Sequence, residues 1–550
     1  MRALKLLLPA SVILVSSLTA QACGDSSAAN PDSDGGLADG TVSGDGAASQ
    51  DGSAADAPAD GTAITPQGPS VLEFHKHPSR NGVYVDALIT KAKAATIHKD
   101  PAFQATIAGH VFSQVLYAEN GPGGKEAVFV ATESNNVYAL DASSGAQLWM
   151  TKLGPEMIDH PSFTGCGNLT PLGVTSTPII DLAARRMYVG AVVAAVGGVA
   201  PMFQKVFALS LDDGKPVTGS GWPLDLETAV PGFKSQWQSQ RGALALMKGT
   251  LYVPYGGYVG DCGAYRGRVV GIATATGTVV NNYVTASDVS GIWSPGGLAS
   301  DGTNIYATTG NAPGGTATWG GQEAVLRLQV GPTFSNTAAD YFAPSNWQEM
   351  DTNDKDMCGA GPVLVDVPGA TPSKLVLGMS KLGVVHLLDR SNLGGIGTGD
   401  GGTGEGLASK PVIGGEIHTA AATYATRLGT YVVFNGDTGG IDCPGATAGS
   451  LVAIKITPTA PPTISVAWCA TPPGQGAPMV TTTDGQNETL VWVSGSSTLR
   501  AFDGDTGAPV FPGGGAAEAM GNVRHWVPPI AAKGRVLIAG DNAVYAFTVK

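Results

Sequence analysis

The stretch Val128–Trp149, VFVATESNNVYALDASSGAQLW, has the pattern of two β-strands and the start of a third. Side chains alternate with a period of two from Val128 to Thr132, as they do on a pleated strand. A polar turn follows, then a second strand over Val137–Leu140 and a turn that ends at Gly145. Three short strands cannot bury their apolar faces in water alone. Other parts of the chain must therefore complete the fold.

The same pattern recurs seven more times along the chain. The eight copies align on residues 139, 208, 271, 327, 387, 453, 501 and 546, at intervals of 45–69 residues. Repeats of short strands and turns are typical of β-propellers, in which four-stranded blades surround a central channel. We therefore predict an all-β, eight-bladed β-propeller over residues 70–550.

The repeated unit resembles a known family. Ala139-Leu140-Asp141, Gly145 and Trp149 match the pyrroloquinoline-quinone (PQQ) repeat, whose consensus is roughly A-x-D-x-x-T-G-x-x-x-W, and residues 501–507 match it again. The resemblance implies the fold of quinoprotein alcohol dehydrogenases. Such repeats also build outer-membrane assembly lipoproteins that bind no quinone, so the resemblance indicates fold more than chemistry. Short motifs at residues 240–244, 291–294 and 416–419 are similar to a bacterial lipoprotein branch of these propellers.

The two ends of the propeller must meet to close the ring. The last copy, residues 525–550, has room for three strands. We expect Ser70–Asp86, SVLEFHKHPSRNGVYVD, to supply the fourth and outermost strand of that blade. An N-terminal strand in this position would leave the sheet without a free edge.

Residues 1–22 are typical of an export signal, because Arg2 and Lys5 precede an apolar run. That run is too short for a transmembrane helix. We interpret residues 20–23, AQAC, as a relaxed lipobox with lipidation of Cys23. We then expect an outer-membrane lipoprotein that faces the periplasm or the cell surface. The alternative is an ordinary cleavage site, which would give a secreted or periplasmic soluble protein.

Residues 23–69 form the expected tether after Cys23. Residues 24–68 contain eight aspartates and no lysine or arginine. A segment of this composition cannot bury enough apolar surface to fold, so we predict a disordered acidic linker. Its charge argues against nucleic acid or anionic lipid as a partner. We expect a monomer that contacts the membrane through the lipid only.

The start of each inner strand should face the channel mouth. Polar and aromatic residues at these positions form the candidate ligand-binding set: His110, Gln114, Gln240, Arg241, Trp293, Asp356, His418, Arg524 and His525. Imidazole, guanidinium and indole groups that converge on a pore could bind an anionic or aromatic ligand. The alternative is a water-filled channel lined by polar groups. No catalytic residue can be named from this set.

A quinone site is the runner-up interpretation. Under the resemblance, Trp293 could stack on PQQ and Arg241 or Arg524 could pair with its carboxylates. The related dehydrogenases, however, use an adjacent Cys-Cys disulfide and a Glu/Asn/Asp set for Ca²⁺, and this sequence has no Cys-Cys pair and no C-x-x-C-H haem motif. We therefore expect no cofactor and no metal site. PQQ with Ca²⁺ belongs only to the alternative.

Two functions follow from these observations. The first is a binding or scaffold module at the cell envelope, whose loop-rich face engages a protein, a peptide or a glycan. The second is a PQQ-dependent oxidoreductase of the alcohol dehydrogenase type. For an exported protein, disulfides are the default state of cysteine. We predict a Cys443–Cys469 bond, and the sequence does not decide how Cys166, Cys262 and Cys358 pair.

Overall fold

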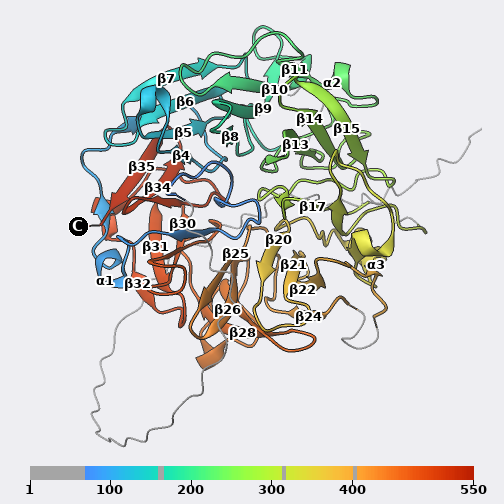
Figure 1. Ribbon diagram of the computed structural model, residues 1–550, viewed down its shortest axis with the longest axis vertical. Coiled ribbons are helices and arrows are strands. Elements are labelled where there is room, and N and C mark those ends of the chain that lie inside the picture. Colours follow the sequence, from blue (N-terminus) through green and yellow to red (C-terminus); the bar gives the residue numbers. More distant parts are fainter. Residues whose placement is uncertain (1–67, 159–165, 313–316, 400–404, 550) are drawn as a thin grey trace, which may run out of the picture.

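The strands form eight sheets arranged in a ring, which confirms the eight-bladed β-propeller (Figure 1). The structure is a computed structural model that describes residues 68–158, 166–312, 317–399 and 405–549. The expected export signal and nearly all of the expected tether lie outside these residues. Within the described ranges, no helix is both long and apolar enough to span a membrane.

The first four blades follow one another along the chain, and the first strand of each lies nearest the channel. Blade 1 contains β4 (Leu116–Ala118), β5 (Ala127–Ala131), β6 (Asn136–Asp141) and β7 (Gln147–Lys152). Blade 2 contains β8 (Ile179–Asp181), β9 (Arg186–Ala194), β10 (Met202–Ser210) and β11 (Leu224–Asp225). Blade 3 contains β12 (Ala245–Met247), β13 (Thr250–Tyr255), β14 (Arg268–Ala273) and β15 (Thr278–Val284). Blade 4 contains β16 (Ala299–Ser300), β17 (Ile305–Thr308), β18 (Val325–Leu328), β19 (Tyr341–Ala343) and the added β23 (Gly395–Ile396).

The other four blades complete the ring. Blade 5 contains β20 (Val363–Asp366), β21 (Lys374–Met379), β22 (Val384–Asp389) and β24 (Ala408–Pro411). Blade 6 contains β25 (Ala422–Thr426), β26 (Gly429–Asn435), β27 (Leu451–Thr457) and β28 (Thr463–Ala470). Blade 7 contains β29 (Met479–Thr482), β30 (Leu490–Gly495), β31 (Thr498–Asp503), β32 (Pro509–Phe511) and the added β1 (Val83–Val85). Blade 8 contains β33 (Ile530–Ala532), β34 (Arg535–Gly540), β35 (Ala543–Thr548), β2 (His98–Lys99) and β3 (Ala105–Thr106).

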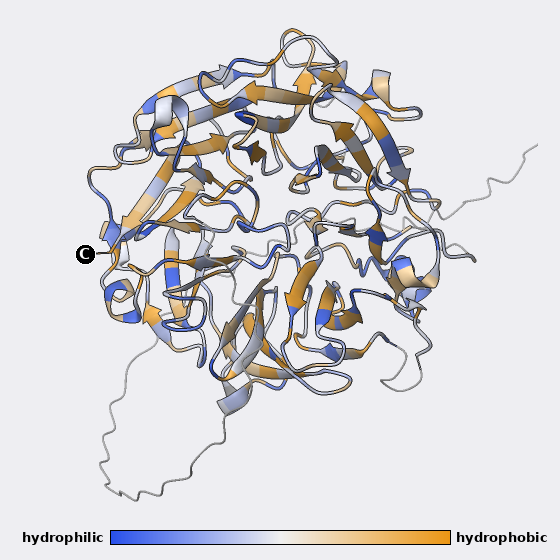
Figure 2. Cartoon of the chain, in the orientation of Figure 1, coloured by the Kyte–Doolittle hydropathy of each residue, from blue (hydrophilic) through white to orange (hydrophobic). Residues whose placement is uncertain are grey.

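Helices are short and lie in the connections. The α-helices are α1 (Lys91–Ala94), α2 (Leu226–Ala229) and α3 (Trp347–Asn353), and the 3₁₀ turns are η1 (Pro122–Gly124), η2 (Ala338–Asp340), η3 (Pro444–Ala446) and η4 (Gly515–Glu518). The core lies between adjacent blades, where the second and third strands are buried on both faces, as β5 and most of β6 show. Figure 2 accordingly shows hydrophobic strands joined by more hydrophilic connections.

The repeated tryptophan and glycine hold neighbouring blades together. The Trp149 indole N–H of blade 1 donates to the Leu211 carbonyl of blade 2 at 3.0 Å. A Cβ atom at Gly214 would lie only 2.5 Å from this indole, so the close approach requires glycine. A Cβ atom at Gly277 of blade 3 would likewise lie only 2.8 Å from the Trp222 indole of blade 2. The tryptophan and glycine of the repeat therefore form contacts between neighbouring blades.

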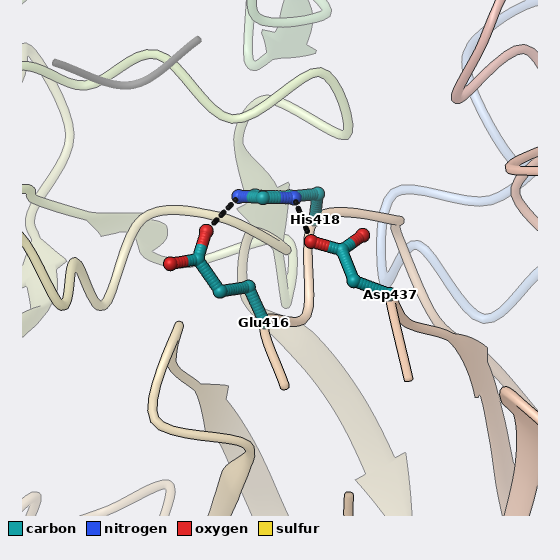
Figure 3. Close-up of side chains that lie close together, drawn as sticks. All are labelled: Glu416, His418 and Asp437. Carbon is teal, nitrogen blue, oxygen red and sulfur yellow. Dashed lines mark ion pairs between the residues drawn. The ribbon is translucent and has the colours of Figure 1, made fainter. Parts of the chain in front are cut away.

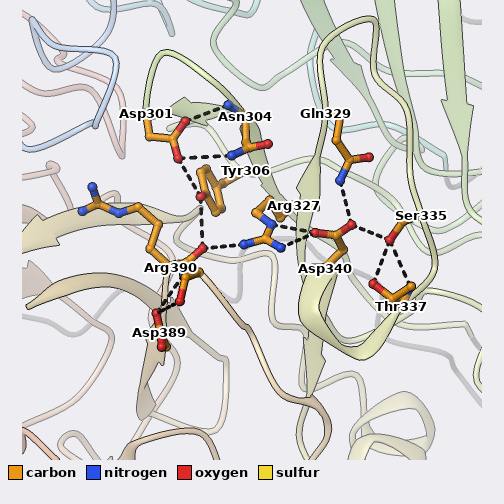
Figure 4. Close-up of polar contacts among 11 residues, drawn as sticks. Asp301, Asn304, Tyr306, Arg327, Gln329, Ser335, Thr337, Asp340, Asp389 and Arg390 are labelled. Atoms are coloured by element: carbon orange, nitrogen blue, oxygen red, sulfur yellow. Dashed lines mark hydrogen bonds and ion pairs between the residues drawn. The ribbon is translucent and has the colours of Figure 1, made fainter. Parts of the chain in front are cut away.

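A polar network links blades 4 and 5 (Figure 4). The Arg327 guanidinium contacts Asp340 at 2.6 Å and donates to the Arg390 carbonyl of blade 5 at 2.7 Å. The Tyr306 hydroxyl donates to Asp301 at 2.9 Å. Arg327 and Asp340 are largely buried, so these hydrogen bonds satisfy charges that water cannot reach.

The prediction that Ser70–Asp86 closes the last blade is wrong. On its outer edge, β35 pairs with β2 and β3, both antiparallel, and these strands come from residues 98–106. The chain N-terminal to the first blade does close the ring, but with a later and shorter segment than expected. The strand-like alternation of residues 83–85 is real, yet β1 pairs in parallel with the inner strand β29 of blade 7.

Residues 70–86, here called the inner segment, run through the channel (Figure 1, blue). Their backbone hydrogen bonds reach the inner strands of blades 1, 2, 4, 5, 6 and 7: Val71 with Tyr117, Leu72 with Ile180, Pro78 with Ser300, Ser79 with Leu364, Asn81 with Thr423 and Gly82 with Val480. The inner segment thus contacts most of the ring and fills part of the pore.

Arg80 fixes the inner segment at the centre of the molecule. Its side chain is buried and donates to the carbonyl oxygens of Leu298 and Leu244, both at 2.7 Å, and of Phe74 at 2.8 Å. It also forms an ion pair with Glu73 at 2.9 Å. Burial raises the pKa of Glu73 to about 7, although the positive charge of Arg80 opposes this shift.

Candidate functional site

The mouth of the channel is the end at which the inner strands begin. The loops that join the second and third strands of each blade reach the same end. The inner segment lies below it, and Phe74 contributes to the floor of a small cavity beside Arg241 and Trp526. Side chains that converge above this floor form the candidate site.

Two buried indoles and one guanidinium form its centre. The guanidinium carbon of Arg241 lies 4.0 Å from the ring centre of Trp526 and 5.8 Å from that of Trp293. The two indole centres are 6.5 Å apart. A cation over an aromatic face is attracted to the π electrons, and the contact restricts the orientation of the guanidinium. Trp526 has φ = 66°, a conformation that non-glycine residues rarely adopt.

Lys381 adds a second cation above Trp293. Its ammonium lies 5.8 Å from the Trp293 ring centre and pairs with Asp356 at 2.6 Å and Asp354 at 3.0 Å. The Lys381 and Asp356 side chains are buried. Asp356 also accepts a hydrogen bond from the Asn311 backbone at 2.7 Å. Lys381 is therefore part of a buried cluster of ion pairs and hydrogen bonds.

His418 is held between two carboxylates (Figure 3). Its Nε2 lies 3.0 Å from Glu416 and its Nδ1 lies 3.5 Å from Asp437. Burial works against protonation, but hydrogen bonds and charge from Asp437 and Glu416 outweigh it and raise the pKa of His418. The two carboxylates flank opposite edges of the ring. This arrangement stabilises an imidazolium better than it would hold a metal ion, since it leaves neither ring nitrogen for a ligand bond.

A second cluster lies on the blade 8 side of the mouth. Arg524 donates to His110 Nδ1 and pairs with Asp541, both at 2.7 Å. The His525 ring centre lies 4.4 Å from that of Trp526, which joins this cluster to the central indoles. Of the predicted set, His110, Arg241, Trp293, Asp356, His418, Arg524 and His525 therefore gather around the mouth.

Gln114 and Gln240 serve the fold instead. Gln114 accepts a hydrogen bond from the His75 backbone at 3.0 Å and donates to the Glu73 carbonyl at 3.2 Å, so it holds the inner segment. Gln240 donates to the Gly242 carbonyl at 2.6 Å and accepts from the Ser176 hydroxyl. Both glutamines are buried.

Sequence reasoning missed several groups at the mouth. Lys381, Glu133 and Glu323 lie in loops between second and third strands, which reach the mouth from the same end of each blade as the start of the inner strand. Burial raises the pKa of Glu133 to about 7, against opposing hydrogen bonds from Gly173 and Thr175 and the charges of Arg241 and Arg524. Burial, with the charges of Asp356 and Asp351, raises the pKa of Glu323.

A cleft opens beside the central indoles, between blades 2, 3 and 4. This side cleft has a volume of about 820 Å³, part of it open to solvent. Trp293 and Arg241 form the wall towards the channel axis, and Tyr258, Asp261 and Tyr265 lie on the blade 3 side. Burial raises the pKa of Asp261 to about 6, although a hydrogen bond from the Tyr265 hydroxyl at 2.5 Å opposes the shift.

Disulfides brace the loops of the propeller. The predicted Cys443–Cys469 bond is confirmed, with Cα atoms 5.6 Å apart. Cys166 and Cys262 form a second bond and join two of the loops that line the side cleft. Cys358 is buried and is not in a disulfide with another described cysteine.

The sequence and the fold of the chain are similar to those of several known proteins. The family model described as outer membrane protein assembly factor BamB matches residues 108–318. Among solved structures, a quinohemoprotein alcohol dehydrogenase of Comamonas testosteroni matches with a TM-score of 0.57 at 14% identity, covering 87% of this chain and 80% of the other. The chain has a β-propeller fold similar to that of PQQ-like proteins.

Further solved structures agree with the PQQ-like propeller fold. A quinohemoprotein alcohol dehydrogenase of Pseudomonas putida HK5 has a TM-score of 0.59 at 11% identity, covering 88% of this chain and 80% of the other. A europium-containing methanol dehydrogenase has a TM-score of 0.58 at 13% identity, covering 87% and 89%. No curated protein sequence matches the chain. Identities this low show the fold alone.

The donors at the mouth do not suit the calcium ion of a quinoprotein. Calcium requires a cluster of oxygen ligands that carries net negative charge. Asp356 and Asp354 hold the Lys381 ammonium at 2.6 and 3.0 Å, so a cation of the protein already neutralises these carboxylates. A calcium ion placed there would be repelled by Lys381. We therefore derive no redox step through a quinone.

Proposed function

We propose that this PQQ-like propeller is a binding module of the cell envelope that holds an anionic group at its mouth. The group would belong to an envelope protein, a peptide or a glycan. The observation that carries the proposal is the Arg241 guanidinium, which lies against Trp526 and Trp293 at 4.0 and 5.8 Å from their ring centres. A guanidinium fixed in this way has lost much of its freedom before a ligand arrives, which lowers the entropic cost of binding.

Two further cations lie near the same indole. The Lys381 ammonium and the His418 ring centre lie 5.8 and 6.4 Å from the Trp293 ring centre. Lys381 faces Asp356 and Asp354, and His418 faces Glu416 and Asp437. The proposal therefore depends on Arg241 and not on a positive charge of the whole mouth.

Binding of a small anionic probe tests the proposal. We expect fluorescein-labelled hexaglutamate to bind the purified full chain and labelled hexaglutamine not to bind, because only the first carries side-chain carboxylates for Arg241. Arg241→Gln should weaken binding about tenfold or more, since a charge-assisted hydrogen bond to carboxylate is lost. Fluorescence anisotropy at low and high salt measures both effects.

Arg427→Gln is the matched control, because Arg427 is exposed in the turn between β25 and β26 at the opposite end of the propeller. Equal affinity for the two peptides, or an undiminished affinity in Arg241→Gln, would show that the mouth does not select anions. Reconstitution with PQQ and Ca²⁺ tests the alternative. A bound-quinone spectrum together with dye reduction by alcohols would contradict the proposal of a binding module and support a quinoprotein dehydrogenase.

We further propose that the protein is exported and anchored through Cys23. The support is the sequence alone, in which an apolar segment precedes AQAC and an acidic stretch follows it. A short apolar segment at a chain start is typical of export signals, and a lipid on one cysteine provides anchorage without a membrane-spanning helix.

Fractionation of cells that express the full chain tests the anchor. The unaltered protein should sediment with membranes, and Cys23→Ala should appear in the soluble exported fraction because the acylated thiol is gone. Cys358→Ala is the control, since Cys358 is buried in the propeller. Unchanged membrane partitioning of Cys23→Ala would exclude lipidation at this residue.

A further inference from the structure

The side cleft adjoins the mouth and has the lining of a small-molecule site, with aromatic walls and a few polar side chains. Arg241 and Trp293 belong to both the mouth and the cleft. A ligand with one anionic group at Arg241 could therefore extend into the cleft.

The chemistry of the lining is that of a hydroxyl-rich ligand. Besides the aromatic walls, short polar side chains face the cleft from four loops: Asn168, Thr170, Thr175, Ser239, Asp261 and Asn311. Small hydroxyl and amide groups with one carboxyl can exchange hydrogen bonds with several ligand hydroxyls, whereas the Trp293 indole offers an apolar surface to the C–H face of a sugar ring. At the other wall, Arg241 can pair with a carboxylate.

An extended peptide is a poorer occupant. Peptides that bind propellers or sheets by adding a strand need a free strand edge. The inner edges of β4, β25 and β29 already carry backbone hydrogen bonds from Val71, Asn81 and Gly82 of the inner segment. Near the cleft, the Gly167 N–H donates to the Val259 carbonyl at 2.8 Å, so the two cross-linked loops also pair with each other.

We infer that the side cleft is a subsite for an acidic sugar, such as a uronic acid within a short oligosaccharide. The carboxylate would pair with Arg241, the sugar ring would pack on Trp293, and ring hydroxyls would hydrogen bond Asp261, Ser239 and Asn311. This inference rests on the proposed function, because it places the anionic group at the same arginine. It adds the class of ligand and the direction in which the ligand extends.

Calorimetry with two disaccharides tests the subsite. We expect the full chain to bind α-1,4-digalacturonate at least about tenfold more tightly than the neutral α-1,4-galactobiose, which has hydroxymethyl groups in place of the carboxylates. Arg241→Gln should abolish this difference. Equal affinities for the two sugars, or no heat of binding with either at millimolar concentration, would overturn the inference.

Asp261→Asn separates this inference from the proposed function. The change keeps the size of the side chain and an acceptor for the Tyr265 hydroxyl, so the fold should persist, as an unchanged melting temperature would show. We expect weaker binding of digalacturonate by roughly threefold to tenfold and unchanged binding of hexaglutamate. If the unaltered protein binds hexaglutamate but not digalacturonate, the proposed anion-binding function stands and the sugar subsite is contradicted. If the unaltered protein binds neither ligand, both proposals are contradicted.

Discussion

Arg80→Met is expected to lower the free energy of unfolding by about 3–5 kcal/mol, because it removes one member of a buried ion pair and leaves the other in place. The guanidinium donates to three carbonyl oxygens from the inner segment and from two blades, and it pairs with Glu73 at 2.9 Å. Methionine fills similar space but satisfies none of these groups. Equilibrium unfolding in guanidinium chloride, followed by tryptophan fluorescence, measures the loss.

Two further variants show whether the ion pair is the cause. Arg427→Met removes an exposed arginine and should change stability by less than about 0.5 kcal/mol. Glu73→Gln added to Arg80→Met should recover part of the loss, because no buried carboxylate remains to be neutralised. Wild-type stability in Arg80→Met would mean that the Arg80 side chain does not help to hold the ring.

Lys381→Met is expected to destabilise the protein by about 3–5 kcal/mol at pH 8 and by less at pH 5. Without the ammonium, Asp356 and Asp354 lose the cation that lies 2.6 and 3.0 Å away. Burial and the charge of Asp356 already raise the pKa of Asp354 to about 7, although Lys381 opposes the shift. Removal of Lys381 should raise it further.

The direction of the pH effect follows from proton binding. A carboxyl whose folded pKa exceeds its unfolded value of 3.8 binds protons more strongly in the folded protein. Its contribution to stability is complete below pH 3.8 and is lost as the pH rises through about 7. The variant should therefore regain stability as the pH falls from 8 to 5. Thermal unfolding at pH 5, 6.5 and 8 measures this trend.

Lys410→Met provides the comparison for Lys381→Met. Lys410 pairs with Asp442 at 3.0 Å, but the Asp442 side chain is 65% exposed. Surface pairs of this kind contribute about 0–1 kcal/mol, so the control should lose little stability at any pH. An equal loss for Lys381→Met at pH 5 and pH 8 would show that the neighbouring carboxyls do not titrate in this range.

The fold was predictable from the repeat because the copies share a strand and turn pattern, and several carry the tryptophan that contacts the next blade. Asp141 specifies a local turn, and Trp149 contacts the next blade. The place of residues 70–86 was not predictable. Alternation shows that a segment can form a strand, but not which sheet edge it joins, and β1 joins the inner edge of blade 7 rather than the outer edge of blade 8.

The candidate site was predictable to the extent that topology fixes it. The start of an inner strand must face the mouth, which correctly placed Arg241, Trp293 and His418 together. The same topology carries the loops between second and third strands to the mouth, where Lys381 and Glu133 lie. The sequence could not rank these loop residues, because the number of side chains that reach the channel depends on loop conformation.

The inner segment also keeps the first described residues away from the open end of the propeller. Gly68, the first described residue, accepts a hydrogen bond from Lys76 at 3.2 Å and lies beside Glu119 in the β4–β5 turn, at the end opposite the mouth. The described chain therefore starts at the back of the propeller. Its first residues do not cover the mouth, so a bulky ligand can approach the mouth without hindrance from them.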